Sequence, residues 1–298
     1  MRYHLYHDES KVDGYWHGIY LLPEHSKRLI LDKIKYIREN NNFDGVVSFK
    51  NVKRKNRIFH LKSSFLQLGI ASLIQTNKAF SHPIYFGKRV NGKKQYEQFG
   101  VKIGAKFILF REKDDHKKMS NFLDYGGKVE TTFRMGLKGG IHMLGSEKNE
   151  INIEKFHFDG HKQYGRRVDS DRIINRLNGL RKYCKISNGE NLIDDRSSNH
   201  TKKFCQSYDD CQLLQLTDVL VGSLRYQLSS EKKLVYEELT RPVTSLTSRY
   251  FSGPKRMANS RWRDSFSMSE CYLEDNLWKF QAVEIKSEQQ KNELTLFD

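Results

Sequence analysis

The chain has 298 residues, enough for one large domain or two small ones with a sizeable hydrophobic core. Hydrophobic residues make up 37% and charged residues 30%, and the 18 Phe and 15 Tyr exclude general disorder. Lys and Arg number 52 against 36 Asp and Glu, a formal charge of +16 that favours a polyanionic partner, most commonly nucleic acid. A basic surface that only keeps the protein in solution is the alternative interpretation.

Polar residues near the N-terminus, such as His4 and His7, interrupt any apolar run there, so no secretory signal peptide is expected. No apolar run approaches the length of a membrane span. These observations predict a soluble, cytoplasmic protein. The four cysteines form no close Cys-x-x-Cys pair, which favours reduced, buried thiols over zinc ligands.

The first elements are predicted from aromatic runs and from apolar spacing. Residues 2–8 and 14–23 are expected to be two strands of a hairpin joined by a polar turn. Residues 24–40 carry isoleucines at helical spacing and predict a helix. Residues 44–52 predict a further strand, and residues 57–76 a further helix.

The middle of the chain has a mixed pattern. Residues 82–90 and 105–112 predict strands, and the polar, Gly-containing residues 91–100 between them predict a hairpin tip or an insertion. Residues 115–144 are compatible with two helices that break at Gly126 and Gly127.

The last third alternates strand and helix. Residues 151–159 predict a strand, residues 169–184 and 209–228 predict helices, and residues 232–250 are predicted to be helical up to Arg241. The pattern assigns no element to residues 267–286. Together, these elements predict an α/β fold. The opening hairpin excludes a purely parallel sheet, so a mixed β-sheet flanked by helices is expected.

Three aspartates stand where a carboxylate is unusual. Asp8 ends the first predicted strand, Asp159 ends the strand over residues 151–159, and Asp218 lies inside an apolar helix. Burial of an unpaired carboxylate costs on the order of several kcal/mol. If the three converge at one sheet edge, they form an oxygen cluster suited to Mg²⁺ or Mn²⁺, which supports phosphodiester cleavage.

Each aspartate also has a purely structural interpretation. Asp218 would pair with Arg225 on the same helix, and the strand-end aspartates would cap turns. Gly222, one turn beyond Asp218, would let another backbone or a ligand come close. A zinc-like spacing also joins His157 and His161, but these residues follow a strand, so the spacing does not predict zinc.

Two phrases, "YHDES" and "LLQLTDVLVGSLRY", with "FHFDG" between them, resemble domain-of-unknown-function family 3800. Its members typically open with a strand ending Asp-Glu-Ser-Gly and later carry a helix close to Leu-Gln-Leu-Ala-Asp-Leu. The family is similar to the ribonuclease H-like nuclease fold. The resemblance implies a ribonuclease H-like domain over residues 1–228, with an insertion around 90–145 and helical additions, and a C-terminal extension over residues 229–298 packed on it.

By this resemblance Asp8, Asp159 and Asp218 match the acidic positions of the metal site, with catalytic and metal-binding roles. Glu9 also matches the opening motif, although alternation along a straight strand would turn it away from Asp8. Asp194 or Asp195 is a further candidate ligand, with a loop turn as the alternative for this pair.

The chain departs from the family pattern in two places. Lys11 stands where the family usually has Gly after the serine. Many members also carry an acidic residue in a strand resembling "VVSFKNV", whereas Val46, Val47 and Ser48 offer no carboxylate. A site with three aspartates would bind metal less tightly. The alternative function is therefore a catalytically inactive nucleic-acid-binding subunit of a larger complex.

Two basic clusters are expected to contact phosphates. Trp262 stands between two arginines, which also suits stacking on bases. The candidate nucleic-acid-binding residues are Lys50, Lys53, Arg54, Lys55, Arg57, Lys255, Arg256, Arg261, Trp262 and Arg263. The leading prediction is thus a Mg²⁺- or Mn²⁺-dependent nuclease acting on DNA or RNA, with a further protein partner or self-association left open and no membrane partner. The resemblance also implies a bacterial defence or mobile-element effector.

Overall fold

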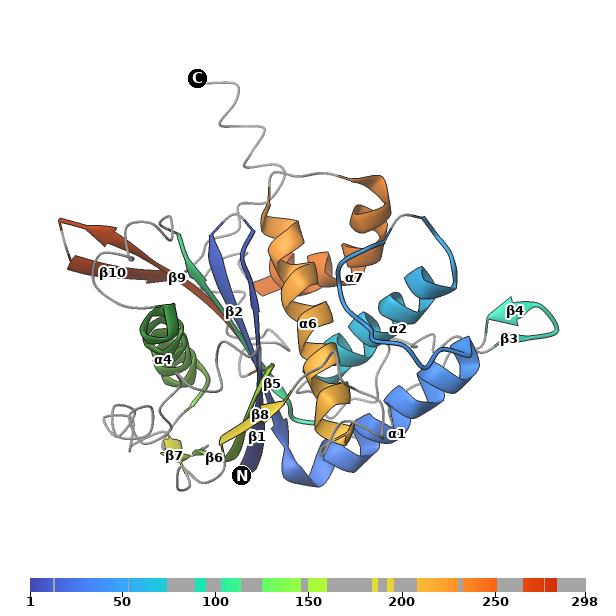
Figure 1. The fold of residues 1–298 in the computed structure, drawn as a ribbon, viewed down its shortest axis with the longest axis horizontal. Coiled ribbons are helices and arrows are strands. Elements are labelled where there is room, and N and C mark those ends of the chain that lie inside the picture. The colour runs from blue at the N-terminus through green and yellow to red at the C-terminus, as the bar shows by residue number, and fades with distance from the viewer. Residues whose placement is uncertain are drawn as a thin grey trace, which may run out of the picture.

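A mixed β-sheet with helices on both faces forms the centre of the structure, a computed structural model (Figure 1). The structure describes residues 1–12, 14–52, 54–73, 89–94, 103–113, 125–145, 150–159, 184–186, 192–195, 208–229, 233–250, 265–275 and 277–282. The predicted α/β class with a mixed sheet is confirmed.

The sheet has the strand order β10-β9-β5-β2-β1-β6-β7, and β8 also pairs with β6. β1 is antiparallel to β2 and parallel to β6, so the first strand lies in the interior of the sheet. The strands of this sheet are β1 (Arg2–Ser10), β2 (Tyr15–Pro23), β5 (Lys106–Glu112), β6 (Ile151–Asp159), β7 (Cys184–Ile186), β8 (Leu192–Asp195), β9 (Phe266–Glu274) and β10 (Leu277–Ala282). A separate small hairpin consists of β3 (Arg89–Val90) and β4 (Lys93–Lys94).

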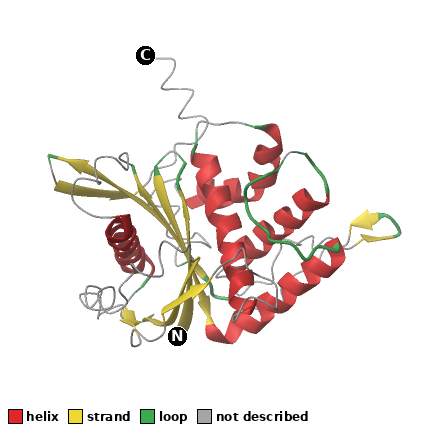
Figure 2. Cartoon of the chain, viewed as in Figure 1, coloured by secondary structure: helices red, strands yellow, loops and turns green. Residues whose placement is uncertain are grey.

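Helix α4 covers one face of the sheet, and α6 lies on the other face with α1, α2 and α7 beside it (Figures 1 and 2). The helices in the described residues are α1 (Glu24–Asn41), α2 (Arg57–Ser72), α4 (Tyr125–Leu144), α6 (Tyr208–Leu228) and α7 (Leu234–Tyr250). Because α6 contacts β1, β2 and β6, it determines which side chains of these strands are enclosed.

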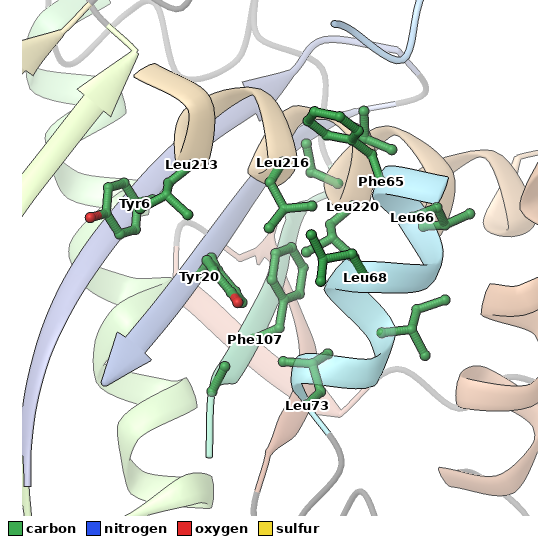
Figure 3. Packing of buried hydrophobic residues seen from close by; sticks show 14 of the residues in the cluster. Tyr6, Tyr20, Phe65, Leu66, Leu68, Leu73, Phe107, Leu213, Leu216 and Leu220 are labelled. Carbon is green, nitrogen blue, oxygen red and sulfur yellow. The ribbon is translucent and has the colours of Figure 1, made fainter. Parts of the chain in front are cut away.

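The larger hydrophobic core fills the space between the sheet, α6 and α2 (Figure 3). Tyr20 and Phe107 project from the sheet toward Leu216 of α6, and all three are buried. A glycine in β2 permits this close approach of the helix. A Cβ atom at Gly18 would lie 2.6 Å from the Cβ atom of Val221 on α6, so any larger residue would push the helix off the sheet.

A shift of register between β1 and β6 decides which β6 side chains face α6. Tyr3 pairs with Ile153, but His4 pairs with Lys155, so one β6 residue is skipped. Ile153 therefore shares the α4-side core with Phe156, three residues later, which strict alternation would not allow. The shift turns the side chains of His157 and Asp159 to the α6 side.

Most predicted elements are confirmed within the described residues: the opening hairpin, α1, α2, β5, β6 and α6. Two ends differ. The helix predicted to stop at Arg241 continues to Tyr250 with Pro242 inside it, and Leu239 and Val243 anchor it in the core. β9 and β10 fall in the segment to which the sequence assigned no element, and they join the main sheet.

Two further expectations concern glycines and cysteines. Gly126 and Gly127 lie in the first turn of α4 rather than at a break between helices, and residues 115–124 are outside the described residues. Cys184 and Cys271 are buried thiols, as expected, but Cys211 at the start of α6 is disulfide-bonded, which corrects the prediction of reduced thiols at that position. The helix predicted over 169–184 lies outside the described residues except for Cys184, which belongs to β7.

The strand predicted over residues 44–52 is wrong, and the reason is visible in its hydrogen bonds. The backbone N–H of Val47 donates to Gln215 Oε1 at 2.8 Å, and the N–H of Phe49 donates to Asp218 Oδ2 at 2.7 Å. Both acceptors are side chains of α6. Val47 and Phe49 are buried, so the alternating pattern is real. The segment is an irregular loop because helix side chains take the place of a neighbouring strand.

Candidate metal centre and nucleic-acid interface

Helix α6 brings the three predicted aspartates together at one edge of the sheet. Asp8 lies near the carboxyl end of β1, and Asp159 is the last residue of β6. Because these parallel strands are neighbours, their carboxyl ends meet at the same edge. Asp218 reaches this edge from the middle of α6, and the negative charges of Asp159 and Asp218 both act on Asp8.

The electrostatics of this acidic cluster, Asp8, Asp159 and Asp218, favour bound protons or cations. Burial, followed by the negative charges of Asp218 and Asp159, raises the pKa of Asp8 well above its ordinary value. Burial also raises the pKa of Asp218, while hydrogen bonds from Phe49 N–H and from the Asp8 carboxyl lower it. The hydrogen bond between the two carboxyl groups therefore favours the protonated form of Asp8 and the ionised form of Asp218.

One oxygen of this cluster has no protein partner. Asp8 is buried, and its Oδ2 atom accepts no hydrogen bond in the described part of the chain. A buried carboxylate oxygen without a partner is costly in free energy. An oxygen-seeking cation such as Mg²⁺ or Mn²⁺ would satisfy it, so the donor set fits the predicted metal.

The alternative structural role of Asp218 is not observed. Asp218 forms no ion pair with Arg225 within the described residues, and the charges of Asp159, Lys50 and Lys62 act on it instead. Gly222 permits a close approach, as expected, but the group that comes close is the side chain of Phe49 rather than a backbone or a ligand. A Cβ atom at Gly222 would lie 2.3 Å from Cγ of Phe49, so the glycine lets the loop of residues 44–52 lie against α6.

Two lysines stand beside the acidic cluster. Lys50 is exposed, and its charge lowers the pKa of Asp218. Lys62 of α2 is buried; its ammonium donates a hydrogen bond to the carbonyl of Lys50, and burial lowers its pKa to about 8. Lys62 was not among the predicted site residues. The available signal was a lysine on the face of α2 that also carries Phe59 and Leu66, both buried.

The two lower-ranked ligand candidates have different positions. Glu9 points away from Asp8. It lies on the same side of β1 as His7, whose ring contacts Phe133 of α4, and it pairs with Lys11 at 3.3 Å. The structure therefore does not bring Glu9 into the acidic cluster. Asp195 is paired in register with Asp159, where β8 lies beside β6. Its backbone thus reaches the same edge of the sheet.

The first basic cluster, which begins at Lys50, lies next to the acidic cluster because the neighbouring Phe49 N–H is hydrogen-bonded to Asp218. Lys50, Arg54 and Arg57 are exposed in the following loop and at the start of α2. Lys55 is also exposed but pairs with Glu238 of α7. The remaining predicted residues lie outside the described residues: Lys53, Lys255, Arg256, Arg261, Trp262 and Arg263.

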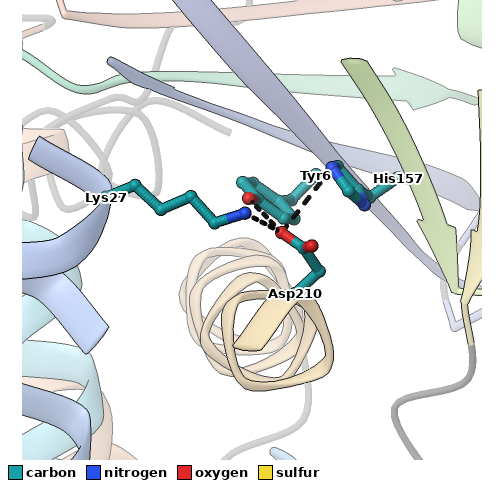
Figure 4. A network of polar contacts seen from close by, with 4 residues as sticks. All are labelled: Tyr6, Lys27, His157 and Asp210. Carbon is teal, nitrogen blue, oxygen red and sulfur yellow. Dashed lines mark hydrogen bonds and ion pairs between the residues drawn. The ribbon is translucent and has the colours of Figure 1, made fainter. Parts of the chain in front are cut away.

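A second polar cluster lies on the same face, nearer the N-terminal end of α6 (Figure 4). Asp210 Oδ1 accepts a hydrogen bond from the Tyr6 hydroxyl at 2.6 Å and pairs with Lys27 Nζ at 2.5 Å. His157 Nε2 lies 3.6 Å from the same oxygen, and the His157 ring stacks between those of Tyr6 and His4. This cluster was not predicted from the sequence.

The charges in this second cluster are balanced. Burial would raise the pKa of Asp210, but the charges of His157 and Lys27 and the hydrogen bonds from Lys27 and Tyr6 outweigh it, so the pKa is lowered. Burial, aided by the charge of Lys27, lowers the pKa of His4 to about 4. Asp210 is therefore ionised and His4 is neutral at neutral pH.

Two sets of potential ligand atoms lie within 4.8 Å of one another among the described residues: His4, His157 and Asp210, and His4, Glu24 and Glu154. The acidic cluster does not meet this spacing, so its carboxylates would have to move inward to bind a single ion. Comparison of the chain with known protein families and with curated proteins finds no match. None of the described helices is both long enough and apolar enough to span a membrane.

Proposed function

We propose that the chain is a divalent-cation-dependent nuclease whose active site is the acidic cluster. The observation that carries the proposal is the buried, unpartnered Oδ2 of Asp8 beside two further carboxylates from β6 and α6. Asp8, Asp159 and Asp218 would hold Mg²⁺ or Mn²⁺. A bound ion of this kind supplies an activated water and stabilises the leaving oxygen in phosphodiester hydrolysis.

The proposal includes the ribonuclease H-like fold and membership of family 3800. Support comes from the central strand β1, its antiparallel hairpin partner β2 and its parallel partner β6, with carboxylates at the carboxyl ends of both parallel strands. The helix that carries "LQLTD" adds the third carboxylate from one side of the sheet. The motif order along the chain supports the same assignment.

Nucleic acid is the proposed substrate. The exposed side chains of Lys50, Arg54 and Arg57 continue directly from the loop that is bonded to Asp218. Cations beside a carboxylate cluster would neutralise phosphates on either side of the scissile bond. The excess of 16 positive charges favours a polyanion at long range.

A second candidate function is an inactive nucleic-acid-binding subunit. The loop of residues 44–52 carries Asp44 but no carboxylate at Val46, Val47 or Ser48, and the backbone N–H of Phe49 already occupies Asp218 Oδ2. This bond replaces part of the ligand capacity of Asp218. Such a protein would keep the basic loop and bind nucleic acid without cleaving it.

The deciding experiment is digestion of plasmid, single-stranded DNA and RNA in Mg²⁺, Mn²⁺ or chelator. The nuclease proposal expects cleavage that requires the ion and that is abolished by Asp8→Asn, Asp159→Asn or Asp218→Asn. Asp32→Asn on the exposed face of α1 is the matched control and should leave the rate unchanged. Cleavage in chelator would reject the metal mechanism, and tight binding without cleavage would favour the inactive subunit.

A further inference from the structure

The cluster around His4, His157 and Asp210 has the composition of a transition-metal site rather than of a Mg²⁺ site. Two imidazoles and a carboxylate offer ligand atoms that all lie within 4.8 Å of one another. Imidazole nitrogen suits Zn²⁺ and similar d-block ions, whereas Mg²⁺ prefers oxygen alone. This cluster is therefore chemically distinct from the acidic cluster at the sheet edge.

An independent observation concerns His4. Its side chain is 5% exposed, and Nδ1 has no hydrogen-bond partner within the described residues. A buried imidazole nitrogen without a partner is unfavourable in a protein interior.

We propose that His4, His157 and Asp210 form a binding site for Zn²⁺ or a similar d-block dication, separate from the nuclease centre. Tyr6 would not bind the metal but would orient one of its ligands, since its hydroxyl donates a hydrogen bond to Asp210 Oδ1 at 2.6 Å. Each ligand comes from a different element, namely β1, β6 and α6. A metal there would join the two parallel strands to the helix.

Lys27 acts as the competing cation in this site. Its ammonium lies 2.5 Å from Asp210 Oδ1 and balances the carboxylate charge when no metal is bound. The side chain of Lys27 is 21% exposed, so its flexible stem can carry the ammonium out to water when a dication arrives. Figure 4 shows Lys27 reaching the carboxylate from α1, on the side opposite His157.

The other ligand set that includes His4 is a weaker candidate. Glu24 is exposed, and Arg2 already bridges Glu24 at 2.9 Å and Glu154 at 3.3 Å. A dication there would have to displace a guanidinium from two carboxylates while gaining only one imidazole. The buried set with two imidazoles is favoured for that reason.

The test is a titration of the full chain with Co²⁺, a spectroscopic substitute for Zn²⁺, in excess Mg²⁺ to saturate oxygen-only sites. We expect one equivalent to bind with a visible absorption band that Zn²⁺ abolishes. His4→Gln should weaken binding by about tenfold or more, and Lys27→Met should tighten it by about tenfold, because the competing cation is gone. His25→Gln, an exposed histidine on α1, is the matched control and should change nothing.

Three outcomes would overturn the proposal: no stoichiometric band, a band unchanged in His4→Gln, or metal binding that is not tighter in Lys27→Met. The last would mean that Lys27 and Asp210 are only a structural ion pair. Thermal melts in chelator check that each variant folds. If His4→Gln does not fold, the Lys27→Met affinity alone decides, because a purely structural role gives no tightening. Nuclease activity plays no part in the measurement, so the result stands apart from the proposed function.

Discussion

Replacement of Gly222 by alanine tests whether the loop of residues 44–52 and the acidic cluster are mechanically coupled. In a helix interior, Gly→Ala by itself stabilises by about 1 kcal/mol. Here the new Cβ would lie 2.3 Å from Cγ, 2.4 Å from Cβ and 2.6 Å from Cδ1 of Phe49. Phe49 would therefore have to move, and its N–H would leave Asp218.

The expected cost follows from these two effects. Overpacking costs about 1–3 kcal/mol, and loss of a hydrogen bond to a carboxylate costs about 1.5–3 kcal/mol. After subtraction of the helix gain, Gly222→Ala should lower the free energy of unfolding by about 1.5–5 kcal/mol. Urea denaturation with linear extrapolation measures this directly.

Gly139 of α4 is the matched control, because a Cβ atom there would meet only Ser269 Oγ at 3.8 Å. Gly139→Ala should therefore be neutral or stabilise by up to about 1 kcal/mol. If Gly222→Ala is as stable as the wild type, the loop is not held against α6 in the way described, and the reasoning about Phe49 and Asp218 fails.

Four further perturbations address the charges around the acidic cluster. Asp218→Asn removes electrostatic repulsion with Asp8 and Asp159 and keeps an oxygen that accepts from Phe49 N–H, so the metal-free variant should melt at or above the wild-type temperature and lose its response to Mg²⁺. A clear loss of stability with the Mg²⁺ response intact would contradict this. Folding raises the pKa values of Asp8 and Asp218, so the folded state binds more protons than the unfolded state. Without divalent ions, the free energy of unfolding should therefore fall as pH rises from 3.8 through the raised pKa values. Denaturation curves of the Asp8→Asn and Asp218→Asn double variant should lack this fall. Folding lowers the pKa of Lys62 from 10.5 to about 8, so as pH rises from about 8 to 10.5 the free energy of unfolding of the wild type should increase by about 3 kcal/mol relative to that of Lys62→Met. Parallel pH profiles of the two proteins would show that burial of Lys62 is not costly. Combined replacement of Lys50, Arg54 and Arg57 by alanine should weaken nucleic-acid binding across sequences and reduce the slope of log K against log salt by about one per lost phosphate contact, whereas an unchanged slope would assign these residues to a solvated surface.

The acidic cluster was predictable from the chain because each member breaks a local rule. A carboxylate at a strand end or within an apolar helix stands out against its neighbours, and parallel strands bring such ends together. The backward orientation of Glu9 also followed from simple alternation. For these residues, local pattern and three-dimensional position agree.

The loop of residues 44–52 could not be predicted in the same way. Its alternating pattern is that of a strand, but its hydrogen-bond acceptors, Gln215 and Asp218, are almost 170 residues away and belong to a helix. The cluster of His4, His157 and Asp210 was hidden for a related reason. Both histidines stand among aromatic strand residues, and only the register shift between β1 and β6 turns His157 toward α6.

The interior position of β1 in the sheet has a consequence for how the chain folds during synthesis. β2 can pair with β1 as soon as both leave the ribosome, but β6, on its other side, begins at Ile151. Until then the backbone groups of β1 that pair with β6 have no partner strand, and most side chains of β1 are ones that the folded protein buries. Pairings so distant in sequence close slowly, and an open strand edge invites pairing with other chains. Nascent chains in which β6 has not yet been synthesised should therefore depend on chaperones more than the folded protein does.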